Sequence, residues 1–282
     1  MTGSISKNNR PIGVFDSGIG GLTVVKQIMA SLPHEQIIYF GDTARVPYGS
    51  KSNETVIEYS LQNSRFLISK DVKAIVVACN TASSIALPAL KKEFDIPVIG
   101  MIEPGAALAL RSTVNRKIGV IGTRVTVSNK AYSTEIHTRN ADAHVYEKAC
   151  PLFVPLAEEG WLDHEATELI AYDYLRELKQ NDIDTLILGC THYPLLKEII
   201  QRAVGEEVHL IDSGVAAALT LMDEIGPENS SAVHAQPVHH FYVSDLPERF
   251  KDAAERFLGK EISALEKVEL DTLIRLHSTK RA

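Results

Sequence analysis

Short apolar runs alternate with longer amphipathic stretches along most of this chain. Apolar runs bounded by turn residues are typical of strands buried on both faces of a parallel sheet, and apolar residues at helical spacing predict helices between them. The alternation predicts an α/β fold with mostly parallel sheets. We expect strands over residues 12–15, 37–40, 74–78, 98–102, 118–121, 143–146, 185–188 and 208–211, and helices over 22–32, 54–69, 164–180 and 250–258.

The two halves of this series resemble each other. IGVFDSGIGGLTVVKQ from Ile12 matches IGVIGTRVTVSNKAY from Ile118 in its strand and turn, and AIVVACNTASS around Cys79 matches TLILGCTHYPLL around Cys190. The matched points lie 67 residues apart in the first half and 72 apart in the second. Two matched pairs at similar spacing favour a duplicated α/β lobe. We therefore expect two pseudo-symmetric, flavodoxin-like lobes with the active site in the cleft between them.

The segment after the second half is too short to form a third lobe. It contains a strand-like run at residues 239–245 and the helix expected over 250–258, so we expect it to return to the first lobe. The first lobe would then comprise residues 1–103 and 213–282, and the second lobe residues 104–212.

Composition and charge narrow the class of protein. Of the 282 residues, 45% are hydrophobic and 23% are charged, which is typical of a soluble globular protein. The net charge of -7 comes without a basic block that would follow a nucleic-acid backbone. No apolar run is long enough to span a bilayer, and the polar start lacks the apolar stretch of a signal peptide. We predict a cytoplasmic protein with reduced thiols that needs neither nucleic acid nor a membrane.

Two of the three cysteines lie directly after an apolar strand. Cys79 and Cys190 therefore fall at carboxyl ends of strands, where parallel sheets bind ligands. The segments ASSIALPAL and YPLLKEII that follow look helical, and a helix N-terminus would favour the thiolate. A lone buried cysteine is more often structural, but two in equivalent positions of related lobes favour chemistry. Cys150 has no counterpart in the other lobe, so we expect it to be structural.

Lobes that each present one thiol can hold a substrate between two opposed proton carriers. One thiolate removes a proton from carbon and the other thiol delivers one to the opposite face, which inverts the stereocentre. Asp16 at the end of the first strand and His192 beside Cys190 are candidate helpers. The alternatives are that Asp16 only caps a turn and that His192 is an ordinary surface or core histidine.

Other chemistries fit the sequence less well. The segment DSGIGG at residues 16–21 is a candidate anion cradle, but Thr23 stands where a dinucleotide fingerprint needs its third glycine. Cys190 and His192 would supply two zinc ligands, yet no C-x-x-C or H-x-x-x-H completes the set, so we predict no metal. A thiol–histidine hydrolase remains open, although it leaves Cys79 unexplained.

Several segments closely resemble the glutamate racemases of bacterial cell-wall synthesis, in the aspartate/glutamate racemase family. The resemblance covers nearly the whole chain, from residue 12 to about residue 258. It is strongest in DSGIGGLTV at 16–24, GDTARVPYG at 41–49, VACNTAS at 77–83 and GCTHYPLL at 189–196, and extends to IGMIEPG at 99–105, PLFVPLAEEGW at 151–161 and FYVSDLPERF at 241–250.

The resemblance implies a cofactor-independent interconversion of L- and D-glutamate that supplies D-glutamate for peptidoglycan, and a homodimer. It implies that Cys190 takes the α-proton from the L-isomer and Cys79 from the D-isomer. Asp16 would assist Cys79, and His192, partnered by Glu158, would assist Cys190. The substrate's charged groups would be held by Asp16, Ser17, Tyr48, Gly49, Asn80, Thr81, Thr191 and His192.

Some of these assignments have simpler alternatives. Asp42 in GDTARVPYG is a further polar candidate, but Asp42 and Glu158 also fit surface or capping carboxylates. Tyr48 and Gly49 follow Pro47 and are also typical of a simple turn. For the whole protein, the alternatives are a relative that acts on aspartate, hydantoins or another small acid, and a two-lobe binding protein without catalysis. Solvent deuterium separates catalysis from binding, since only a racemase transfers it to Cα.

Overall fold

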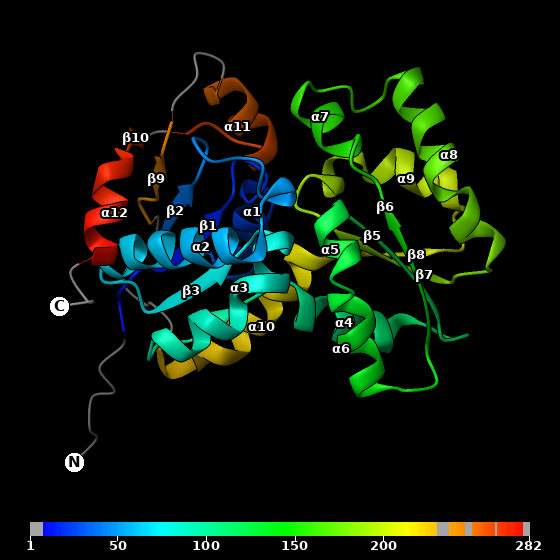
Figure 1. Cartoon of the computed structure of the whole chain (residues 1–282), viewed down its shortest axis with the longest axis horizontal. Helices are drawn as coiled ribbons and strands as arrows, with labels where there is room; N and C mark the ends of the chain where they lie inside the picture. Colours follow the sequence, from blue (N-terminus) through cyan, green and yellow to red (C-terminus); the bar gives the residue numbers. More distant parts are fainter. Residues whose placement is uncertain (1–7, 230–236, 246–249, 263, 279–282) are drawn as a thin grey trace.

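Two parallel sheets stand side by side in the computed structural model, which describes residues 8–229, 237–245, 250–262 and 264–278 (Figure 1). The first sheet has the order β10-β9-β2-β1-β3-β4 and the second β6-β5-β7-β8. Within these residues every strand pairing is parallel, which confirms the predicted α/β class. The strands are β1 (Ile12–Asp16), β2 (Ile37–Gly41), β3 (Ala74–Val77), β4 (Val98–Ile99), β5 (Lys117–Gly122), β6 (His144–Ala149), β7 (Thr185–Gly189), β8 (His209–Asp212), β9 (His240–Val243) and β10 (Leu265–Lys267).

Helices cover the faces of both sheets, and the four predicted helices agree with the structure to within about one residue. None of the helices in the described ranges combines the length and the apolar character needed to cross a membrane. The helices are α1 (Leu22–Ser31), α2 (Asn53–Ile68), α3 (Asn80–Glu93), α4 (Ile102–Ser112), α5 (Arg124–Ser128), α6 (Ala131–Arg139), α7 (Phe153–Glu158), α8 (Glu165–Gln180), α9 (Lys197–Val204), α10 (Ser213–Asn229), α11 (Phe250–Leu258) and α12 (Leu270–Ser278), with 3-10 turns η1 (Tyr48–Ser50) and η2 (Tyr193–Leu196).

The strand orders contain the duplication that the sequence predicts. The run β2-β1-β3-β4 in the first sheet has the same order as β6-β5-β7-β8 in the second, so β1 corresponds to β5 and β3 to β7. The last part of the chain adds β9 to the edge of the first sheet, where it pairs with β2, and β10 beside it. The expected strand over 98–102 is shorter than predicted because the chain turns into α4 at Ile102.

The apolar core joins the two lobes. One continuous cluster includes Val14 of β1, Leu188 of β7 and Phe257 of α11, so a single apolar core extends from one lobe into the other. Separate clusters lie on the opposite faces of the two sheets, around Phe15 in the first lobe and Val120 in the second. Successive residues of a strand point to opposite faces, which is why Val14 and Phe15 belong to different clusters.

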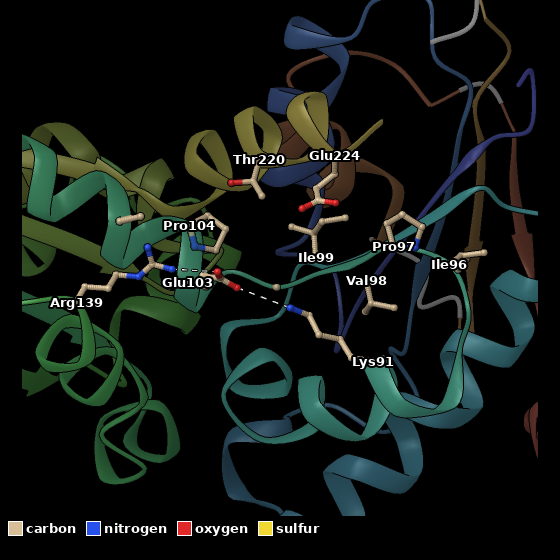
Figure 2. A pocket seen from close by; sticks show the side chains of 12 residues that line it. Lys91, Ile96, Pro97, Val98, Ile99, Glu103, Pro104, Arg139, Thr220 and Glu224 are labelled. Atoms are coloured by element: carbon tan, nitrogen blue, oxygen red, sulfur yellow. Dashed lines mark hydrogen bonds and ion pairs between the residues drawn. The ribbon is translucent and has the colours of Figure 1, made fainter. Parts of the chain in front are cut away.

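The chain crosses between the lobes twice, from β4 into α4 and from β8 into α10. A cavity of about 500 Å³ lies beside these crossings. Figure 2 shows Glu103 at its edge, reaching toward Lys91 of α3 and Arg139 of α6, with N–O distances of 3.7 and 3.0 Å. Partly exposed pairs of this kind contribute about 0–1 kcal/mol, so they stabilise the region beside these crossings only weakly.

Candidate active site

A cavity of about 80 Å³ lies between the lobes, where β1, β3 and β7 end. One water needs about 10–15 Å³ of such volume, so the cavity suits a small substrate rather than a dinucleotide. Both predicted catalytic cysteines line it, and so do all the predicted substrate contacts except Asp16. Its lining residues are Ser17, Gly18, Val46, Pro47, Tyr48, Gly49, Cys79, Asn80, Thr81, Thr123, Val154, Glu158, Cys190, Thr191 and His192.

Cys79 occupies the N-cap position of α3, as predicted. Its Sγ accepts a hydrogen bond from the Ala82 backbone N–H at 3.5 Å, and its thiol donates to the Ser17 Oγ at 3.6 Å. We expected the helix N-terminus to ease loss of the thiol proton, but the net effect is the opposite. Burial, with the nearby Asp16 charge adding to it, raises the pKa of Cys79 to about 12. Cys79 is therefore held as a neutral thiol, the state from which it can donate a proton.

Asp16 lies at the end of β1, behind the wall of the cavity. Its carboxylate Oδ2 accepts a hydrogen bond from the Gly18 N–H at 3.0 Å, while Oδ1 has no hydrogen-bond partner among the described residues. Burial raises the pKa of Asp16, and the positive charge of His192 and nearby backbone N–H groups oppose that rise. Asp16 is thus placed to influence the charges of Cys79 and His192, and it is the one predicted substrate contact that does not line the cavity.

Cys190 follows β7 but does not cap an α-helix. The helix predicted to begin directly after it is wrong, because the chain first makes the 3-10 turn η2 and α9 starts only at Lys197. Pro194 fits the first turn of a helix, where its missing N–H has no partner to lose. The immediate polar neighbour of Cys190 is instead His192, whose Nδ1 lies 3.8 Å from the thiol Sγ.

His192 links Cys190 to a carboxylate. Its Nε2 lies 2.9 Å from Glu158 Oε1, and the opposite ring nitrogen faces Cys190 and the Thr191 hydroxyl. Burial lowers the pKa of His192, but the hydrogen bonds with Cys190 and Glu158 outweigh it and raise the pKa to about 10. The ring therefore carries a positive charge near neutral pH, beside the thiol that would become a thiolate.

Glu158→Gln is expected to lower the catalytic rate about 10-fold. The substitution removes one of the two partners that raise the pKa of His192, so this pKa falls and the alkaline limb of the profile of kcat/KM against pH moves to lower pH. Rates of turnover measured between pH 6 and 10.5 would show both effects. Glu159→Gln, at the exposed neighbouring position outside the cavity, is the matched control. An unchanged alkaline limb in Glu158→Gln would contradict the coupling.

Polar side chains connect the lobes around the cavity. Thr81 at the start of α3 shares a hydrogen bond with the Thr123 hydroxyl at 3.0 Å, and the Asn80 Oδ1 accepts one from the Tyr132 hydroxyl at 2.7 Å. Thr123 was not among the predicted site residues, although the repeat contained a signal for it. When Ile12 is aligned with Ile118, Thr123 is the counterpart of Ser17.

Tyr48 is held in the cavity wall by a buried polar network. Its hydroxyl donates to the Asp42 carboxylate and accepts from Asn63 Nδ2 at 2.9 Å. Arg45 pairs with Asp42 at 2.8 Å, so the charge of this carboxylate is compensated. Asp42 itself does not line the cavity, and its position supports Tyr48 from behind.

The cavity combines two thiols, one from each lobe, with mostly neutral hydrogen-bond donors. Cys79 comes from the first lobe and Cys190 from the second, while His192 supplies the positive charge. Among the described residues, no lysine or arginine lines the cavity. No group of three or more histidine, cysteine, aspartate or glutamate side chains in the described ranges is arranged to hold a metal ion. Such a site can hold a small anionic molecule through hydroxyl, amide and imidazolium groups and exchange protons from two sides.

Known proteins share this architecture. The family model described as Asp/Glu/Hydantoin racemase matches residues 20–221. Glutamate racemase from Geobacter metallireducens is 50% identical over 263 residues, which cover 93% of this chain and 97% of that protein. Glutamate racemase from Francisella tularensis, solved in complex with D-glutamate, has a TM-score of 0.87 at 44% identity, covering 94% of this chain and 99% of that one. A glutamate racemase isoform from Bacillus anthracis has a TM-score of 0.89 at 40% identity, covering 93% and 98%. The predicted resemblance to glutamate racemases is confirmed, and the chain belongs to the Asp/Glu/Hydantoin racemase family.

Proposed function

We propose that this protein interconverts L- and D-glutamate by a two-thiol mechanism that needs no cofactor. The observation that carries the proposal is the placement of Cys79 and Cys190, at equivalent strand ends of two related lobes, on one small cavity. The relatives named glutamate racemase span nearly the whole chain, and one of them was solved with D-glutamate. The fold alone would not select this substrate, because related sites serve different acids.

For L-glutamate, the Cys190 thiolate would accept the α-proton, and the electron pair would stay on Cα and its carboxylate. The Cys79 thiol would then donate its proton to the opposite face, which forms the new C–H bond and leaves a Cys79 thiolate. The raised pKa of Cys79 supports its role as the proton donor in this direction. D-glutamate would react by the same steps in reverse, and exchange of protons with solvent would restore the thiols after each turnover.

The carbanion is the difficult intermediate, because the α-proton of an amino acid is very weakly acidic. Donors already in place around the cavity would stabilise its developing charge more than bulk water does. We assign this role to the hydroxyl groups of Ser17, Thr81 and Thr191 and to the imidazolium of His192, with Asn80, Tyr48 and Gly49 completing the binding site. Asp16 would act on Cys79 through its charge, and Glu158 on Cys190 through His192.

The remaining expectations form part of the same proposal. D-glutamate made in the cytoplasm would supply peptidoglycan synthesis, as the resemblance implies, and the active form would be a homodimer. We also retain the division of the chain into one lobe of residues 1–103 and 213–282 and another of 104–212. The outermost residues of the first lobe, 1–7 and 279–282, lie outside the described residues.

Incubation with L-glutamate in deuterated buffer, without pyridoxal phosphate, tests the proposal. We expect the optical rotation to decay to zero, while Cα of the product becomes deuterated. L-aspartate and a hydantoin, run in parallel, would show whether the activity belongs to a different substrate. Exchange with none of these compounds by the folded protein would favour a binding function instead.

A further inference from the structure

The helix α11 belongs to the segment that breaks the symmetry of the two lobes. This segment follows the duplicated strands and adds β9 and β10 to the first sheet, whereas the second sheet, described in full, has no such addition. Figure 1 places α11 at the edge of the first lobe that faces α7 of the second. It packs on α1 within its own lobe, so it is anchored to the first lobe. Its contacts across the cleft therefore join the two lobes near the active site.

Two consecutive residues of α11 contact the groups that surround Cys190. The ring of Phe257, which is fully buried, meets the His192 ring edge-to-face, with centroids 5.2 Å apart and planes at 81°. Arg256 Nη1 donates a hydrogen bond to the backbone oxygen of Glu158 at 3.0 Å. The guanidinium also lies against Gly160, where an added Cβ would come within 2.7 Å of Nη1. One helix of the first lobe thus contacts both members of the His192–Glu158 pair in the second.

We infer that Arg256 and Phe257 are positioning residues: they hold Glu158 and His192 in the arrangement that keeps the His192 ring beside the Cys190 thiol. This inference rests on the proposed function. It means that a helix of the first lobe completes the group formed by Cys190, His192 and Glu158 in the second lobe, called here the Cys190 assembly. The two thiols then differ in their requirements. The Ser17 hydroxyl beside Cys79 comes from the same lobe, whereas the Cys190 assembly needs α11 from across the cleft. Separation of the lobes at this edge would release the Cys190 assembly and leave that of Cys79 intact.

The charges around His192 determine which substitution tests the inference cleanly. Cys190 on its own loop, Glu158 of α7 and Asp16 at the end of β1 face His192, and Arg256 reaches the backbone of Glu158. Phe257 carries no charge, so Phe257→Leu leaves all these charges in place. A change in the pKa of His192 in that variant then comes from altered packing around the ring and not from a lost charge, and the double variant described below tests whether that packing acts on the rate through His192.

The experiment compares Phe257→Leu and Arg256→Met with two controls on the same helix. Phe250→Leu changes another buried phenylalanine of the same apolar cluster, and Lys251→Met removes another exposed cation. NMR titration of histidine-labelled protein follows the pKa of His192, identified by the signal that His192→Asn loses. In Phe257→Leu we expect this pKa to fall by about one unit and kcat to fall about 10-fold, with KM changed less than about 2-fold. In Arg256→Met we expect a similar loss of kcat, whereas both controls should keep the kcat of the parent.

A double variant separates positioning from general loss of stability. If Phe257 acts through His192, then Phe257→Leu should reduce kcat no further in the His192→Asn background. A further loss of about 10-fold there would overturn the inference, as would a His192 pKa in Phe257→Leu equal to that in Phe250→Leu. The pKa readout does not need activity. A parent protein that racemises nothing would refute the proposed function, while the titration would still decide whether α11 positions His192.

Discussion

Replacing either Cys79 or Cys190 with alanine is expected to reduce racemisation of glutamate by about 10²- to 10⁴-fold or more. A positioned acid or base contributes rate factors of this size, and each thiol is needed in both directions, once as base and once as acid. Because the two enantiomers are equally stable, kcat/KM must remain equal for L- and D-glutamate in every variant. The assignment of each thiol therefore has to come from proton exchange rather than from directional rates.

Deuterium exchange at Cα makes that assignment. Cys79→Ala retains the thiol assigned to L-glutamate, so it should exchange the α-proton of the L-isomer without inversion, and Cys190→Ala should do the same for the D-isomer only. Cys150→Ala is the matched control, since this third cysteine is also buried but does not line the cavity. Racemisation by either active-site variant within about 10-fold of the parent would refute the two-thiol mechanism.

Gly20→Ala is expected to reduce kcat/KM about 100-fold, although it adds only one methyl group. A Cβ at this position would come within 2.3 Å of Thr191 Oγ1 and 2.5 Å of His192 Cε1. Its φ lies outside the left-handed region, so alanine suits the backbone and the conflict arises only across the cleft. The lobes must separate or His192 must shift, and displacements of about 1 Å can cost about 100-fold in rate.

The comparison is Gly18→Ala in the same loop, where the nearest contact of the new Cβ would be Val46 Cγ2 at 3.4 Å. We expect a much smaller loss there, with melting temperatures of both variants recorded alongside kcat/KM. Equal losses in the two variants would show that the loop itself, and not the approach of Gly20 to His192, limits the rate.

The amino-acid sequence by itself determined much of this protein. Apolar runs of strand length specify the sheets because burial on both faces requires them, and this pattern located nearly all the strands. The internal repeat predicted two lobes, and it placed Cys79 and Cys190 at equivalent strand ends. Both features rest on patterns that are each recognised within a short stretch of the chain, even where two such stretches lie far apart, and short stretches are where sequence patterns are most informative.

Only the tertiary structure decided how these residues act on one another. The helix N-terminus lowers the pKa of Cys79 through the Ala82 N–H as predicted, but burial outweighs it and the net direction is the opposite of the predicted one. At Cys190 the expected helix is replaced by the 3-10 turn η2. Arg256 and Phe257 carry no local signal, since a helix pattern does not show which distant side chains it will meet. Distances across the cleft arise from the packing of two lobes against a shared core, and that packing places the groups around His192.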